Sequence, residues 1–137
     1  MPTGHGYLIH REWSAQSASE TAPTTATTGF ENPQFFPGAD ALRVTFSEFT
    51  VSASDTTVTF RLWLKTRSED GTEFVVPYDD AIATLSGSST TLYATPSTTT
   101  VSDAPAGSWY VQLDDLSTSG TASVTGSVKL QYVQEND

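Results

Sequence analysis

Two pairs of adjacent aspartates are the residues of this chain whose type and spacing most readily suggest chemistry. Asp79 and Asp80 form one pair, and Asp114 and Asp115 form the other. Carboxylate oxygens bind Ca²⁺, which takes about 6–8 oxygen ligands. Neighbouring residues of a strand point to opposite faces, however, so neither pair converges on one ion by itself. We predict solvated or turn-capping carboxylates and no metal site, with Ca²⁺ binding by either pair as the alternative.

The sequence offers little for covalent or acid–base catalysis. Its two histidines, His5 and His10, lie in the first ten residues, and no GxSxG, HExxH or Walker motif is present. Glycoside hydrolysis would need two carboxyl groups about 5–9.5 Å apart across a shaped cleft, and a small Thr-rich domain with short loops has little material for one. We therefore predict a protein that is not an enzyme and uses no cofactor.

Two aromatic residues are expected on the outer face of a sheet. Trp63 and Tyr110 interrupt otherwise polar positions of their strands. Exposed aromatic side chains on a sheet stack on sugars or become buried in a protein interface. They can also be covered by the edges and loops of their own domain. The sequence leaves these three outcomes open.

The composition indicates β-structure and argues against two classes of partner. Forty of the 137 residues are Ser or Thr, and there is no Cys. β-Branched Thr suits the solvated face of a sheet, whereas Ser and Thr hydroxyls compete with the hydrogen bonds of a helix interior. The net charge of −10 repels phosphate backbones and anionic membranes, so neither is an expected partner. The acidity either confers solubility or reflects a halophilic host.

Alternation of apolar and polar residues from position 41 onward predicts an all-β fold. Strands are expected over 41–53, 57–64, 73–78, 82–85 and 90–95, from 109, and from 124 to 132, with a long loop over 95–106. Seven to eight strands with frequent turn signals indicate an antiparallel β-sandwich or a jelly roll. The expected core comprises Val44, Phe46, Val58, Phe60, Leu62, Val111, Leu113, Val128 and Leu130.

Local signals predict how some of these strands join. Alternation slips by one residue at Ser47–Glu48, which indicates a bulge or bend. The short connection over 54–56 predicts a hairpin between 41–53 and 57–64. The run Ser68-Glu69-Asp70-Gly71 is a strong turn signal, Pro77 marks the end of a strand or an edge strand, and Gly126 marks a bulge.

The first 40 residues differ from the rest and predict an extended N-terminal arm, with residues 41–137 as the sandwich domain. Residues 14–28 are rich in Ser, Thr and Ala, and such a stretch cannot bury enough apolar surface to offset its ordering entropy. Apolar and aromatic residues flank it. We predict that the arm is dispensable for folding and binds neighbouring subunits through Tyr7, Leu8, Ile9, Trp13, Phe30, Phe35 and Phe36.

The whole pattern resembles viral structural proteins. The start at Pro2 without a signal sequence, the polar segment 14–28, the aromatic segment 30–36 and the Thr-rich β-domain are similar to head-decoration (cement) and capsid-surface proteins of tailed phages and archaeal viruses. The resemblance implies a virion protein made in the host cytoplasm that binds the major capsid protein or other virion subunits. It also implies a small homo-oligomer, often a trimer. The alternative is a carbohydrate-binding or adhesion module, such as a fibre-tip or lectin-like domain.

Overall fold

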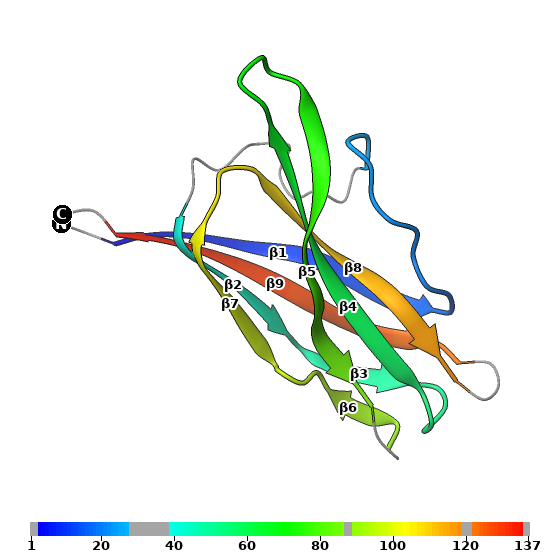
Figure 1. The fold of residues 1–137 in the computed structure, drawn as a ribbon. Helices are drawn as coiled ribbons and strands as arrows, with labels where there is room; N and C mark the ends of the chain where they lie inside the picture. Colours follow the sequence, from blue (N-terminus) through cyan, green and yellow to red (C-terminus); the bar gives the residue numbers. More distant parts are fainter. Residues whose placement is uncertain (1–2, 28–38, 87–88, 119–121, 136–137) are drawn as a thin grey trace.

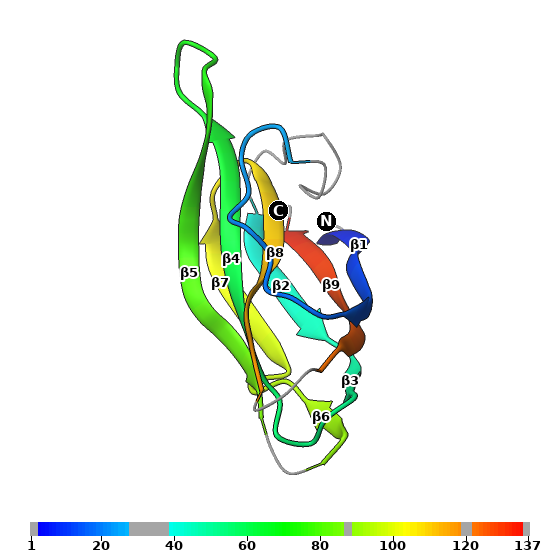
Figure 2. The ribbon, with the colours of Figure 1, turned by 90° about the vertical axis from the view of Figure 1, so that its right-hand side faces the viewer.

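The computed structural model describes residues 3–27, 39–86, 89–118 and 122–135, and these residues form an all-β sandwich. Two antiparallel sheets pack face to face (Figures 1 and 2). In the described part of the chain, no helix is long and apolar enough to cross a membrane. The nine strands of the described residues are β1 (Thr3–Gln16), β2 (Ala39–Phe46), β3 (Glu48–Val51), β4 (Thr57–Arg67), β5 (Glu73–Leu85), β6 (Thr91–Tyr93), β7 (Thr98–Ala104), β8 (Ser108–Ser117) and β9 (Val124–Glu135).

The larger sheet has the order β6-β3-β9-β2-β7, with β1 paired to the other side of β9, and the smaller sheet has the order β5-β4-β8. The predicted antiparallel sandwich is therefore confirmed, whereas the jelly roll is not. The strand count exceeds the predicted seven to eight. The reason is that β1 and β7 were not expected and that 41–53 divides into β2 and β3, while 73–78 and 82–85 merge into the single strand β5.

The core lies between the two sheets, and all nine residues predicted for it are buried. An aromatic cluster occupies its centre. The ring of Phe60 lies 4.9 Å from that of Phe46, 5.6 Å from that of Phe49 and 5.3 Å from that of Trp13. Tilted aromatic pairs at such distances contribute beyond their buried area.

The predicted hairpin between 41–53 and 57–64 is wrong. β3 pairs with β6 and β9 in one sheet, whereas β4 pairs with β5 and β8 in the other. The connection over 52–56 crosses between the sheets, and the buried Thr56 closes its turn by donating from its hydroxyl to the Ala53 carbonyl (2.6 Å). A strand buries alternate residues in either sheet. Alternation therefore does not distinguish a hairpin within one sheet from a connection that crosses between the two sheets.

Three other local predictions are confirmed. The chain breaks at Ser47, between β2 and β3, where Ser47 donates its N–H to the Ser127 carbonyl (2.9 Å) and accepts from the Ser127 N–H through its hydroxyl oxygen (2.9 Å). The break keeps both Phe46 and Phe49 in the core. Gly71, at φ 89°, lies in the turn between β4 and β5, and Pro77 lies within β5, an edge strand of the smaller sheet.

The predicted loop over 95–106 is also wrong, because residues 98–104 form β7. β7 pairs with β2 from Thr98↔Thr45 to Ala104↔Ala39. β-Branched Thr suits a strand, and Val101 provides the buried side chain in the middle of β7. The neighbouring prolines Pro96 and Pro105 suggested a loop, yet both lie outside the paired residues.

The predicted arm needs correction over residues 3–27. Residues 3–16 form β1, whose register with β9 runs from Thr3↔Glu135 to Gln16↔Val124. Trp13 is only 3% exposed and belongs to the main core. The next residues lie along β8, where the Glu20 N–H donates to the Leu113 carbonyl (2.9 Å). β1 thus pairs with β9, at the other end of the chain. The polar composition of the arm gives no sign of this pairing.

Gly126 has a packing role that gives the first testable prediction. A Cβ at this position would lie 2.1 Å from a ring carbon of Phe49, and that ring is fully buried. The register of β1 and β9 shifts beside Gly126, but the extra residue lies on β1 and Gly126 pairs with Trp13, so the irregularity is next to the predicted position and not on Gly126 itself. Gly126→Ala should cost about 1–3 kcal/mol of unfolding free energy, measured by chemical denaturation.

The same experiment has a control on the same strand. Lys129→Ala changes an exposed position of β9 and should leave the unfolding midpoint nearly unchanged. Adding Phe49→Leu to Gly126→Ala should make the glycine substitution less costly, because the smaller side chain frees the clashing space. A Gly126→Ala variant as stable as the parent would contradict this packing.

Candidate functional site

The structure does not assemble the aspartates into a metal site among the residues it describes. Asp114 lies in β8 with its carboxylate 3.9 Å from the Arg61 guanidinium, and its neighbour Asp115 is exposed. Asp79 and Asp80 lie in β5, with side chains outside the described residues. Within the described side chains, no group of three or more potential metal ligands is found.

The residues predicted to bind neighbouring subunits fall into three groups. Tyr7, Leu8 and Ile9 lie in β1, opposite Gln131, Leu130 and Lys129 of β9. The prediction for Trp13 is wrong, because its side chain is buried in the core and cannot serve as a surface anchor. The remaining three, Phe30, Phe35 and Phe36, lie outside the described residues.

Arg11 and Glu20 form a bidentate ion pair that the sequence analysis did not anticipate. The two guanidinium nitrogens of Arg11 donate to the two Glu20 carboxylate oxygens at 2.6 and 2.7 Å, and one of them also donates to the Val111 carbonyl (2.9 Å). The guanidinium lies over the rings of Trp13 (4.9 Å) and Tyr110 (4.7 Å). This pair ties β1 and the segment after it to β8.

The surroundings of Glu20 favour its charged form. Burial alone would raise the pKa of this carboxyl group, but hydrogen bonds from Arg11 and from the Leu113 N–H, the charge of Arg11 and the Trp13 indole N–H together lower it. A carboxyl group with a lowered pKa is a poor general acid. The cluster is therefore best explained as a stabilising contact.

The aromatic outer face is covered by the protein itself. Trp63 and Tyr110 pack together with Val75 and are largely buried. The Trp63 indole N–H donates to the Gln112 side chain (2.7 Å), which in turn donates to the Glu20 carbonyl (2.8 Å). Of the three outcomes left open by the sequence, the structure shows the covered one.

The hairpin of β4 and β5 carries two exposed aromatic residues, Phe74 and Tyr78. It projects beyond the end of the larger sheet in both views (Figures 1 and 2). Phe74 is 40% exposed and Tyr78 is 39% exposed. Between them Val76 packs against the main core, and the Tyr78 ring meets the buried Trp109 edge-on at 4.9 Å. Phe74, Val76 and Tyr78 are alternate residues of β5, and two of them contact the core side of the smaller sheet.

The turn of this hairpin is held by a dense set of hydrogen bonds. The Asp70 carboxylate accepts from the Ser68 hydroxyl and from the Thr72 N–H (3.0 Å). The first of these bonds is the largest reason why the pKa of Asp70 is lowered to about 2. The Gly71 N–H donates to the Ser68 carbonyl (2.9 Å), and the Ser68 N–H donates to the Thr72 carbonyl (2.9 Å). The turn that precedes Phe74 and Tyr78 is therefore fixed by its own hydrogen bonds.

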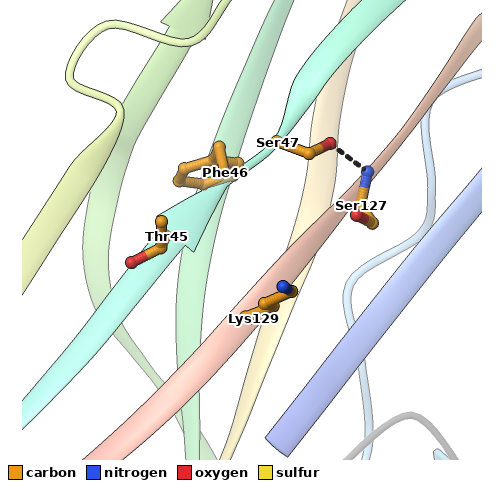
Figure 3. A pocket seen from close by; sticks show the side chains of 5 residues that line it. All are labelled: Thr45, Phe46, Ser47, Ser127 and Lys129. Atoms are coloured by element: carbon orange, nitrogen blue, oxygen red, sulfur yellow. Dashed lines mark hydrogen bonds between the residues drawn. The ribbon is translucent and has the colours of Figure 1, made fainter.

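Two smaller surface features lie on the larger sheet. A shallow pocket of about 90 Å³ is lined by Thr45, Phe46, Ser47, Ser127 and Lys129 (Figure 3), well below the roughly 300–1,000 Å³ of a typical ligand pocket. Tyr93 of β6 is 64% exposed and donates from its hydroxyl to the Glu48 carboxylate (3.0 Å). This hydrogen bond is the main reason why the pKa of Tyr93 is raised.

No known family model matches the chain, and no significant match to a curated protein is found. The class of protein is therefore defined by the fold and its surface. It is an acidic antiparallel β-sandwich with a projecting hairpin that bears exposed aromatic side chains. The turn and the strand 73–78 of this hairpin were predicted from the sequence, but Phe74 was not singled out as an exposed residue.

Proposed function

We propose that this chain is a non-enzymatic structural protein of a virion, a decoration or minor capsid component that docks to other virion subunits. The observation that carries the proposal is the pair of exposed aromatic side chains, Phe74 and Tyr78, on the projecting hairpin. Aromatic residues are enriched in protein interfaces, where a few central anchors supply most of the binding energy. The resemblance to decoration proteins supports the same class.

The charges near the pair suggest what its partner looks like. Glu69, Asp70 and Glu73 lie at the tip of the hairpin, and Arg67 is the cation closest to them in sequence. Its guanidinium is 3.9 Å from the Glu73 carboxylate. The partner surface should therefore offer an apolar pocket with a basic rim, as electrostatic complementarity requires. A capsid protein subunit with such a pocket is the proposed partner.

Particles of the virus that encodes the chain provide the test. Mass spectrometry of purified particles should find the protein in a fixed ratio to the major capsid protein. Phe74→Ser should weaken binding of the added protein to particles that lack it by roughly 30-fold, corresponding to about 2 kcal/mol for one central anchor. Co-sedimentation measures the bound fraction.

A matched control lies elsewhere on the surface. Tyr93→Ser removes the most exposed large aromatic residue of the described chain and should leave particle binding unchanged. Equal melting temperatures of the two variants would show that both are folded. Particles that contain no copies of the protein would contradict the virion assignment, and full affinity of Phe74→Ser would contradict the hairpin as its docking site.

A carbohydrate-binding module remains the second candidate because of one observation. The exposed ring of Tyr93 stands beside the Glu48 carboxylate that its hydroxyl contacts, and an aromatic face beside a hydrogen-bond acceptor is an arrangement that suits a sugar. Under this alternative, Tyr93→Ala would abolish binding on a glycan array, whereas Phe74→Ser would not.

A further inference from the structure

The edges of the two sheets differ in how they are protected against pairing with another chain. An edge strand exposes unpaired N–H and C=O groups, which proteins blunt with prolines, charges, short strands or covering segments. β8 is covered, because Glu20 and Ser19 hydrogen-bond to its backbone. β5 carries Pro77, and a bridge between Thr84 and Thr95 closes its other end.

The larger sheet protects two of its edges by other means. β6 spans only three residues. β7 spans seven and ends in Ser102-Asp103-Ala104, where Asp103 has a positive φ of 50°. A charged residue in that conformation disturbs the regular edge that a partner strand needs. β6 is therefore a poor template for strand addition, and Asp103 restricts the one that β7 offers to its first residues.

β1 lacks such protection between Thr3 and His10. Its register with β9 is regular from Thr3 to Ile9, and among the described residues no strand pairs with its other edge. The sequence of this stretch, TGHGYLIH, has no Pro, Lys, Arg, Asp or Glu. Farther along, Arg11 and Glu12 place charges on the strand, and Arg11 with Glu20 ties it to β8, so the uncharged edge is confined to the first part of β1.

We propose that a second copy of this chain pairs with residues 3–10 of β1, antiparallel and across a two-fold axis. When two copies meet through the same edge in a closed dimer, a two-fold axis relates them. If a residue of one copy then lies opposite a given residue of the second copy, the same contact occurs with the two copies exchanged. The pairing would join the two larger sheets into one continuous sheet. Main-chain hydrogen bonds would supply the affinity, as in other cases of strand addition.

The distribution of charge favours a second copy at this edge. The chain has a net charge of −10, so most pairs of surfaces on two copies would bring acidic groups together. Residues 3–10 contribute none of the sixteen acidic residues, and the β9 residues opposite 3–9 contribute one acidic and one basic residue, Glu135 and Lys129. Pairing of two copies here therefore brings no carboxylate of residues 3–10 against another.

The backbone itself supplies a matched pair of variants. Successive N–H groups of a strand point to opposite edges, so in Tyr7→Pro and Leu8→Pro one proline removes a hydrogen bond to β9 and the other removes an outward donor. The wild-type chain should sediment at twice its 14.7 kDa. The proline that removes the outward donor leaves the pairing of β1 with β9 intact. The variant with the higher melting temperature should therefore be the one that sediments as a monomer. A monomeric or trimeric wild-type chain, or two variants that both remain dimeric, would overturn the proposal.

A cysteine scan gives a second measurement that does not depend on proline. The chain contains no cysteine, so single substitutions at His5, Gly6, Tyr7 and Leu8 introduce a unique thiol into the full-length protein. A residue near the two-fold axis would lie within the Cα–Cα distance of about 4.4–6.8 Å that a disulfide needs. One of the four should form a covalent dimer much faster than Glu69→Cys at the hairpin tip. Equal, slow cross-linking at all five positions would overturn the proposal.

Discussion

Deletion of residues 1–16 should unfold the domain instead of leaving a soluble sandwich. The deletion removes β1, exposes one side of β9 and takes Trp13 out of the aromatic cluster. Trp13→Ala alone should cost about 3–5 kcal/mol, a large part of the roughly 5–15 kcal/mol that stabilises a typical domain. Near-ultraviolet circular dichroism and thermal melts would show loss of the cooperative transition in the deletion and a much lower melting temperature in Trp13→Ala.

A shorter truncation provides the control. Removing residues 1–4 trims the free end of the β1–β9 ribbon and leaves Trp13 and Arg11 in place. That variant should keep a cooperative transition close to that of the full chain. A deletion of 1–16 that melts like the parent would show that β1 is a dispensable arm, as its composition suggested.

Replacing Arg11 by Met should be the second most damaging change. It leaves the Glu20 carboxylate, whose side chain is only 15% exposed, without its ion-pair partner. Breaking such a pair from one side costs about 3 kcal/mol or more. Glu20→Gln should cost less, because the amide keeps the shape and can still accept a hydrogen bond. The double variant Arg11→Met/Glu20→Met should cost less than the sum of its single changes, as measured by chemical denaturation.

The pH dependence of this pair follows from the lowered pKa of Glu20. Its ordinary value is 4.5, and the folded value is lower, so the stabilisation is fully present above pH 4.5 and is lost as pH falls through the folded pKa. The stability difference between the parent and Glu20→Gln should therefore shrink as the pH falls below about 4.5. A difference that is constant down to the acid limit would contradict this role of Glu20.

The core of the fold was predictable because burial and alternation are coupled along each strand. Val44, Phe60 and Leu113 follow the same period of two, and all three are buried. The pairing of strands was harder to predict, because alternation is the same in either sheet. The polar residues around Trp13 concealed its burial, since the partner of β1 is β9, more than a hundred residues away in sequence.

The candidate site was predictable only in part. Phe74 and Tyr78 could be assigned to one face of a strand from their spacing, but their exposure depends on where the opposing sheet ends. That length is set by β2, β7 and β9 and not by the hairpin itself. The Arg11–Glu20 pair likewise depends on β8, which brings together two residues whose own segment gives no sign of a contact.

Hydrogen exchange of the protein, free and bound to virus particles, tests docking through the β4–β5 hairpin most directly. Amides of an exposed strand exchange through local openings, and burial in an interface slows them. The account predicts that residues 73–78 gain protection in the bound state, while β6, which carries Tyr93, does not change. Unchanged exchange over 73–78, with protection gained at another surface, would contradict the hairpin as the docking site.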